Sequence, residues 1–192
     1  MSNFNETLEQ LILEIKEINT IELEKIPNID LYMDQVTTFM EDNLNYFKRS
    51  KEDKILTKTM INNYTKAKIF PPPVKKKYTK NHIMLLIIIY HLKSILSIND
   101  INRLLKPVTD ELKVGEHSKT LETIYKNFVI LQNNNKKNIS SKLTEEPIPF
   151  ETDSIESLEN KTEIKLILTV LFLTIQSNTE KRLSEKIIDK FF

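Results

Sequence analysis

The sequence contains no cysteine, no tryptophan and a single glycine, Gly115, among its 192 residues. Without cysteine the chain can form no disulfide, no thiolate metal site and no cysteine nucleophile. A single glycine argues against sheets that need glycine at turns and bulges, and against phosphate-binding loops built on repeated glycines. The composition therefore predicts an all-α protein.

Long apolar runs are missing as well. The two most apolar stretches, residues 83–90 and 164–175, fall well short of the ~20 residues that a membrane-spanning helix needs. The first ten residues, MSNFNETLEQ, carry no basic segment followed by an apolar core, which a signal peptide would have. We therefore expect no contact with a membrane, and the cytoplasm as the location.

No constellation of catalytic residues is recognisable. The three histidines, His82, His91 and His117, do not have the spacing of a metal site, and no carboxylate pair completes a ligand set. Motifs such as Gly-x-Ser-x-Gly, His-Glu-x-x-His and Gly-Lys-Thr/Ser are absent. The sequence predicts a protein that is not an enzyme and holds no cofactor or metal.

Apolar residues recur at helical spacing along most of the chain, and prolines and cap residues divide this pattern. Asp30, Thr57, Thr79 and Ser97 are the expected N-caps. The helices are expected at residues 4–18, 31–44, 58–66, 80–95, 98–106, 118–132 and 163–176, with a last helix from about 178 to the C-terminus.

Positive charge is concentrated in one segment, although the net charge is only +1. From Lys48 to Lys80 the many lysines are opposed by only two acidic residues, Glu52 and Asp53. Within this segment the stretch IFPPPVKKKYTK, residues 69–80, must break the helical pattern, because proline lacks an amide hydrogen and clashes with the preceding turn. A near-neutral chain therefore has a strongly basic region.

The short helix expected at residues 58–66 has a basic outer face that carries asparagines. A helix fits the major groove of DNA, asparagine can pair with adenine through two hydrogen bonds, and lysines neutralise phosphates. A solvated helix with lysine-rich loops would have the same composition. Composition alone leaves both interpretations open.

Residues 56–105 resemble the DNA-binding domain of MerR-type transcriptional regulators. They follow that family's order of recognition helix, proline turn, wing, long helix and final short helix. The positions that match are Thr57 and Tyr64 at the two ends of the recognition helix, Lys77, Tyr78 and Thr79 at the end of the wing, and Ser97, Ile98, Asp100 and Ile101 in the last helix.

With IPNIDLYMDQVTTFMEDNL ahead of it, the pattern over residues 24–126 is still more similar to the YkrK-like family of low-GC Gram-positive bacteria, a domain of unknown function. The resemblance implies a MerR-like winged helix-turn-helix with a very short wing and flanking helices at both ends. The expected regions are an amphipathic helix in 1–25, the DNA-binding domain in 26–112 and a helical region in 113–192 with an acidic linker at about 133–160.

Three features depart from the MerR pattern, and one is the loop NYFKRSKEDK, which lengthens the connection between the first helix and the recognition helix. Lys68 replaces the glycine that follows the recognition helix, so we expect the usual left-handed cap to be lost. The wing between the prolines and Tyr78 has only residues 74–77, which predicts no more than a tight turn or a minimal ribbon. Contacts from such a wing would go mostly to phosphates.

Candidate DNA-contacting residues follow from the matched positions and the surrounding lysines. Thr59, Asn62, Asn63 and Lys58 are the base-reading candidates, and Tyr78 either donates to a phosphate or packs beneath the wing. The full set is Lys54, Thr57, Lys58, Thr59, Asn62, Asn63, Tyr64, Lys66, Lys68, Lys75, Lys76, Lys77 and Tyr78.

The sequence thus predicts a transcriptional regulator that binds double-stranded DNA in a sequence-specific way as a homodimer, with its flanking helices available for pairing. The alternative is a helical protein-interaction adaptor that does not bind DNA. The operator, the sign of regulation, any effector and the role of residues after Lys126 are not encoded in a readable pattern.

Overall fold

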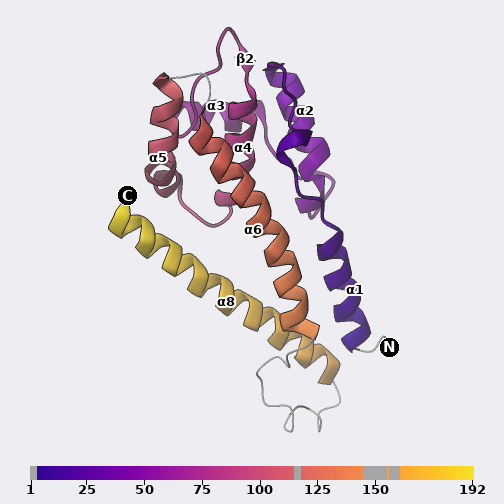
Figure 1. Ribbon diagram of the computed structural model, residues 1–192. Coiled ribbons are helices and arrows are strands. Elements are labelled where there is room, and N and C mark those ends of the chain that lie inside the picture. Colours follow the sequence, from indigo (N-terminus) through magenta and orange to yellow (C-terminus); the bar gives the residue numbers. More distant parts are fainter. Residues whose placement is uncertain (1–3, 115–117, 145–154, 156–160) are drawn as a thin grey trace. The chain divides into compact units, whose positions relative to one another are not determined.

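The computed structural model describes residues 4–114, 118–144, 155 and 161–192, and it is mostly helical with a small two-stranded sheet (Figure 1). The chain divides into two compact units, each described by itself. The core unit comprises residues 19–130 and 185–192, and the helical unit comprises residues 1–18 and 131–184. The all-α prediction therefore holds apart from the small sheet.

Helix α4 (Lys80–Leu92) is the centre of the core unit. All residues from His82 to Ile89 are buried, which is the expected fate of a helix that is apolar on every side. The helices that pack around it are α2 (Met33–Leu44), α3 (Lys58–Lys66), α5 (Ile98–Val114) and the first half of α6 (Lys119–Thr144). Short 3₁₀ turns, η1 (Leu23–Lys25) and η2 (Asn45–Phe47), flank α2.

The N-caps expected at Thr57, Thr79 and Ser97 are confirmed, and Ser118 is a further cap, at the start of α6. The Thr57 hydroxyl accepts from the Met60 amide at 3.1 Å, and the Ser118 hydroxyl accepts from the Leu121 amide at 3.0 Å. The Ser97 hydroxyl accepts from the amide of Asp100 at 3.1 Å. Each of these caps satisfies a backbone donor that has no partner inside the helix, so local sequence is enough to locate these starts.

Asp30 is not the cap of α2, contrary to the prediction. The cap is Tyr32, whose amide donates to Gln35 Oε1 at 2.9 Å, and α2 begins at Met33. Leu31 and Tyr32 instead form strand β1 (Leu31–Tyr32), which pairs antiparallel with β2 (Lys77–Tyr78). Pairing with a strand more than forty residues away keeps this backbone extended, and no local pattern reports it.

Pro107 does not end α5, contrary to the prediction, because the helix continues to Val114. Its apolar face is buried on both sides of the proline, at Ile101, Leu105 and Val108. A proline inside a helix costs ~3 kcal/mol. Burial of one large apolar side chain stabilises by about 1.5–3 kcal/mol, so packing beyond Pro107 offsets most of that cost. The end of α4 also differs, at Leu92 where Ile95 was expected.

The helical unit contains α1 (Phe4–Glu17), the second half of α6 and most of α8 (Lys161–Phe191). The expected helix over residues 4–18 is confirmed. Helix α6 does not end near Gln132 as predicted but reaches Thr144, so residues 133–144 of the expected linker are helical. In this unit the Lys136 ammonium donates to the Ile18 carbonyl at 2.7 Å. The rest of the expected linker lies outside the described residues, apart from the buried Ile155.

Helix α8 is one helix, although two were predicted with a break near residue 178. Thr179 does not cap a new helix. Its hydroxyl donates back to the Ile175 carbonyl at 3.0 Å, and the Gln176 amide donates to Glu180 Oε1 at 2.8 Å. No proline or glycine occurs in residues 161–192, so nothing in the backbone stops the helix.

Of the helices that the structure describes, none has the length and apolar character required to cross a membrane.

Candidate nucleic-acid interface

Helix α3 has one buried and one exposed side. Ile61 and Tyr64 are buried against the core, and the opposite side carries the predicted polar residues. The exposed residues of this side are Lys58, Thr59, Asn62, Asn63 and Lys66. They recur at intervals of three and four residues, so they form one continuous face. The prediction that these side chains share an outer surface is confirmed, whereas contact with DNA remains a prediction.

Lys58 forms an ion pair with Asp34 in the first turn of α2. Both side chains are more than half exposed, so the pair contributes at most ~1 kcal/mol. The contact links α2 to α3, the two helices of the expected helix-turn-helix. A phosphate or base near Lys58 would compete with Asp34 for the ammonium.

The end of α3 retains a left-handed cap, contrary to the prediction made from the missing glycine. Lys68 itself has φ 61°. Its amide donates to the Thr65 carbonyl at 3.0 Å, and the Ile69 amide donates to the Tyr64 carbonyl at 3.1 Å. These two bonds are those of a Schellman motif, in which glycine is the usual residue. For lysine the left-handed conformation costs roughly 1–2 kcal/mol.

The expected minimal wing is a two-residue hairpin. Val74 and Lys77 exchange both backbone hydrogen bonds, at 3.0 and 2.9 Å, and between them Lys75 and Lys76 have φ 49° and 65°. Positive φ at both central residues is typical of a type I′ turn, which normally contains Asn-Gly. Here two exposed lysines occupy it, at the end of the loop next to β2 in Figure 1.

The two candidate tyrosines are buried. Tyr64 is 7% exposed and Tyr78 is 3% exposed, so neither ring is presented to DNA. Tyr78 packs parallel to Phe70, with ring centroids 6.1 Å apart. Of the two alternatives for Tyr78, the structure favours packing beneath the wing, where burial raises the pKa of its hydroxyl. Thr57 acts as a cap and is half-buried.

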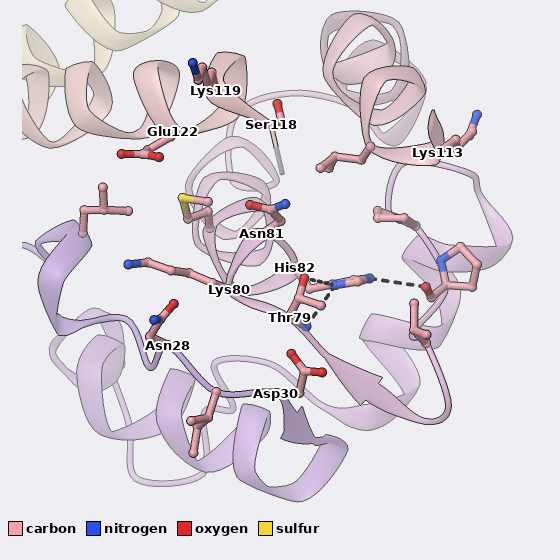
Figure 2. Close-up of a pocket in the computed structure, with 17 residues that line it drawn as sticks. Asn28, Asp30, Thr79, Lys80, Asn81, His82, Lys113, Ser118, Lys119 and Glu122 are labelled. Atoms are coloured by element: carbon pink, nitrogen blue, oxygen red, sulfur yellow. Dashed lines mark hydrogen bonds between the residues drawn. The ribbon is translucent and has the colours of Figure 1, made fainter. Parts of the chain in front are cut away.

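His82 is a residue of this region whose role sequence reasoning missed. The Thr79 amide donates to His82 Nδ1 at 3.1 Å, so Nδ1 is the unprotonated nitrogen, and Nε2 lies 3.3 Å from the Pro72 carbonyl, to which it donates (Figure 2). The ring packs edge-on against Phe70 and Tyr78. Desolvation by burial lowers the pKa of His82, and the Pro72 bond and Asp30 oppose this shift. One neutral imidazole thus joins the proline segment to the start of α4.

A family model described as a domain of unknown function (DUF1836) matches residues 21–128, more than half of the chain. The chain belongs to the DUF1836 family. The matched residues nearly coincide with residues 19–130 of the core unit, so the α3 face, the wing and His82 all lie in the DUF1836 domain. No curated protein and no solved structure matches the chain.

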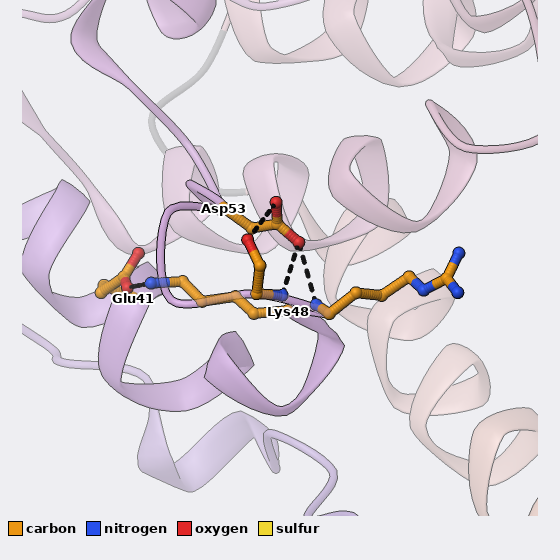
Figure 3. A network of polar contacts seen from close by, with 5 residues as sticks. Glu41, Lys48 and Asp53 are labelled. Carbon is orange, nitrogen blue, oxygen red and sulfur yellow. Dashed lines mark hydrogen bonds and ion pairs between the residues drawn. The ribbon is translucent and has the colours of Figure 1, made fainter.

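The connection between α2 and α3 in the DUF1836 domain is held by two polar contacts (Figure 3). Lys48 pairs with Glu41 of α2. Asp53 accepts from the amides of Arg49 and Ser50 at 2.9 and 3.1 Å, and these bonds, that of Arg49 first, lower the pKa of Asp53. The Asp53 carboxylate thus forms its hydrogen bonds within the loop itself. Lys54, which follows it, is exposed.

The described part of the DUF1836 domain contains no cluster of His, Asp and Glu residues that could hold a metal ion. His82 and His91 are packed in the core, and His117 lies outside the described residues.

The missed role of His82 did have a signal in the sequence. Thr79 and His82 are separated by three residues at the start of a helix, the spacing of a capping box.

Proposed function

We propose that this chain is a transcriptional regulator that binds double-stranded DNA through a MerR-like winged helix-turn-helix. The observation that carries the proposal is the positive φ angle of three lysines. Among the described residues, the non-glycine positions with positive φ are Lys68, Lys75 and Lys76. Glycine would adopt this conformation at no steric cost, so retaining lysine there sacrifices stability. Contact with a polyanion is a reason to retain the charge.

The proposed contacts divide into two groups. Asn62, Asn63 and Thr59 on the exposed face of α3 would read bases in the major groove, where asparagine pairs with adenine. Phosphates would be contacted by lysines at the end of α3, on the loop before it and on the hairpin. This second group is Lys54, Lys66, Lys68, Lys75, Lys76 and Lys77, while Lys58 belongs with the base-reading residues. Tyr64 and Tyr78 would act only by supporting the two elements from below.

The proposed regulator works as a homodimer in the cytoplasm, without enzymatic activity or a cofactor. Helix-turn-helix proteins read two half-sites about one DNA turn apart, which requires a two-fold partner. Apolar side chains that could supply such a contact are exposed on α8, at Ile167, Val170, Leu171 and Ile175. Two α3 helices spaced ~34 Å apart in a dimer would support the proposal strongly.

The proposal is tested by fluorescence anisotropy with DNA from the promoter region of the chain's own gene, measured at several salt concentrations. Each phosphate contact adds about −0.9 to the slope of log affinity against log salt. Replacing Lys75, Lys76 and Lys77 by Glu should abolish binding, and Lys186→Glu on α8 is the matched control. The proposal is wrong if the affinity for DNA does not depend on salt concentration, or if it is unchanged in the triple variant.

A second candidate function is a helical protein-interaction adaptor. The exposed apolar residues of α8 favour it, because monomeric proteins rarely leave large apolar patches in water. In this case the basic region would meet an acidic protein. A pull-down that enriches one acidic protein, with no DNA retained after nuclease treatment, would support the adaptor over the regulator.

A further inference from the structure

A pocket of about 800 Å³ lies at the base of the wing, within the core unit (Figure 2). Residues 28–30, three residues of the wing segment (Pro71, Pro72 and Val74), the first turns of α4 and α6 and the end of α5 line it. Its volume falls in the range of sites that hold small molecules. The role proposed for α3 and the hairpin makes no use of this pocket.

One part of the pocket lining is apolar. Ile29 contributes to it from the loop before β1, and Pro71, Pro72 and Val74 contribute from the wing segment. Ile29 and Val74 are largely exposed, so an apolar group that covers them would remove apolar surface from water. The lining thus favours a ligand with a hydrocarbon part.

The polar part of the lining carries charges of both signs. In Figure 2 the Lys80 side chain extends toward Asn28 and Glu122, and Asp30 lies beside Thr79. Glu122 is bonded to Lys126 at 2.7 Å, and both Lys126 and, to a smaller extent, Lys80 lower its pKa. Asp30 lies close enough to His82 to oppose the fall in its pKa. Lys113 and Lys119 also line the pocket, so three lysines and two carboxylates contribute to its lining.

This arrangement distinguishes between classes of ligand. A simple organic anion in this pocket would be repelled by Asp30 and Glu122. A simple amine attracted to Asp30 would be repelled by the three lysines of the lining. A molecule that carries both charges avoids either penalty, because like charges brought together destabilise a complex and opposite charges stabilise it.

We propose that the pocket binds a small zwitterionic α-amino acid with an apolar side chain. Its carboxylate pairs with Lys80, its ammonium group pairs with Asp30, and its side chain covers Pro71, Pro72 and Val74. Asn28 lies on the polar side of the same pocket and carries an amide group that can hydrogen-bond to the ligand.

The bound amino acid would touch the segment that leads into the hairpin. The Pro72 carbonyl is the acceptor of His82, and Val74 opens the turn that contains Lys75 and Lys76. Occupancy of the pocket therefore restrains the wing. This coupling rests on the proposed function, whereas binding of the amino acid itself does not.

The test is calorimetric titration of the full chain with leucine and with its two deletion analogues. 4-Methylpentanoate lacks the ammonium group, and 3-methylbutylamine lacks the carboxylate. Because an exposed ion pair is worth up to about fivefold in affinity, leucine should bind about fivefold tighter than either analogue. Equal binding of all three, or no leucine binding at millimolar concentration, overturns the proposal.

Two variants test which pocket residue binds each charged group of leucine. Lys80→Gln should weaken leucine and 4-methylpentanoate by about fivefold and leave 3-methylbutylamine unaffected or improved. Asp30→Asn should weaken leucine and the amine and strengthen the carboxylate, with Lys186→Gln as the control and circular dichroism confirming that each variant folds. Unchanged leucine affinity in both pocket variants contradicts the assignment.

DNA anisotropy with and without saturating leucine separates this proposal from the proposed function. If leucine binds as described but no DNA binds in either condition, the regulator is wrong and the amino-acid site stands. If DNA binds and leucine does not, the pocket proposal fails alone. A shift in DNA affinity with leucine that disappears in Asp30→Asn supports both.

Discussion

Helices α4 and α8 each contain a long, mainly apolar run, and the two runs have opposite surroundings. In α4 every residue from His82 to Ile89 is buried by other helices of the core unit. In α8 the run over residues 164–175 packs on one side only, and Ile167, Val170, Leu171 and Ile175 are 50–65% exposed. An apolar run therefore indicates that a helix has a surface to bury. Whether that surface is buried depends on the other elements of the chain that pack against it.

The largest expected effect is on stability in α4. Leu85 is fully buried, so Leu85→Ala should lower the free energy of unfolding by about 2–5 kcal/mol through lost burial and a cavity. Leu171→Ala on the exposed side of α8 should change it by less than about 0.5 kcal/mol. Urea denaturation at low protein concentration measures both. Equal losses would mean that the outer side of α8 is covered.

A second large effect comes from His91 near the end of α4. Its ring lies 5.0 Å from that of Phe47 and 5.2 Å from that of Phe128, and burial lowers its pKa to about 4. Since the folded pKa is below the unfolded value, stability is fully present above pH 6.5 and is lost as pH falls toward 4. At 1.36 kcal/mol per unit the loss is at most ~3 kcal/mol.

Denaturation of the wild type and of His91→Phe between pH 7 and pH 4 checks this sign. The variant should show a flatter pH profile, because it has no imidazole to protonate at that site. Carboxylates such as Asp110, whose pKa is lowered to about 2 by hydrogen bonds from Lys106 and Lys113, add losses only at lower pH. An unchanged slope in His91→Phe would contradict the assignment to His91.

A third effect tests whether a second copy covers α8. Replacing Val170 and Leu171 by Glu should weaken association of the proposed homodimer by at least about 2 kcal/mol, because charges would enter an apolar contact. The far-ultraviolet circular dichroism should not change. Sedimentation equilibrium measures the association. A wild type that stays monomeric at high concentration would remove the homodimer from the proposal.

The smallest effect compares the hairpin with the rigid core beneath it. Replacing Lys75 by Asn and Lys76 by Gly should stabilise the chain by up to about 1 kcal/mol, because these residues tolerate positive φ. The same change should weaken DNA binding and make the salt slope less negative by ~1.8, from two lost phosphate contacts. Thermal unfolding and anisotropy measure the two signs. A variant that binds DNA as tightly as the wild type would leave the strained lysines without a functional reason.

The helix starts at Thr57, Thr79 and Ser97 were predictable because caps are local, and each of these residues bonds within three residues. The start of α2 was missed, since Asp30 is not its cap. Helices α2 and α3 end at Leu44 and Lys66 as expected, but other helix ends were not predicted. Pro107 is overridden by packing on both sides of it, and α6 and α8 continue where polar residues suggested a stop. Strand β1 depends on a partner that is distant in the chain.

The candidate interface was predictable where it depends on helical periodicity. The exposed face of α3 follows from helical spacing alone. The short wing was expected from the resemblance to MerR-type regulators and from the four residues between the prolines and Tyr78. The burial of Tyr64 and Tyr78 and the bond from His82 to Pro72 depend on how separate elements meet, which spacing does not report. Lys68 shows a further limit of prediction from the sequence. A residue that disfavours the left-handed conformation still adopts it when the Schellman bonds and the packing of Ile69 require it.

The two-residue pairing of β1 with β2 has a kinetic consequence for the wing. A ribbon this short is not stable by itself, and the backbone of Lys75 and Lys76 lowers the free energy needed to open it. Amide hydrogens of Val74 and Lys77 should therefore exchange with solvent through frequent local openings, while those of α4 exchange only when the core unfolds. The hairpin is thus a part of the described chain that can change its shape within the lifetime of the folded state.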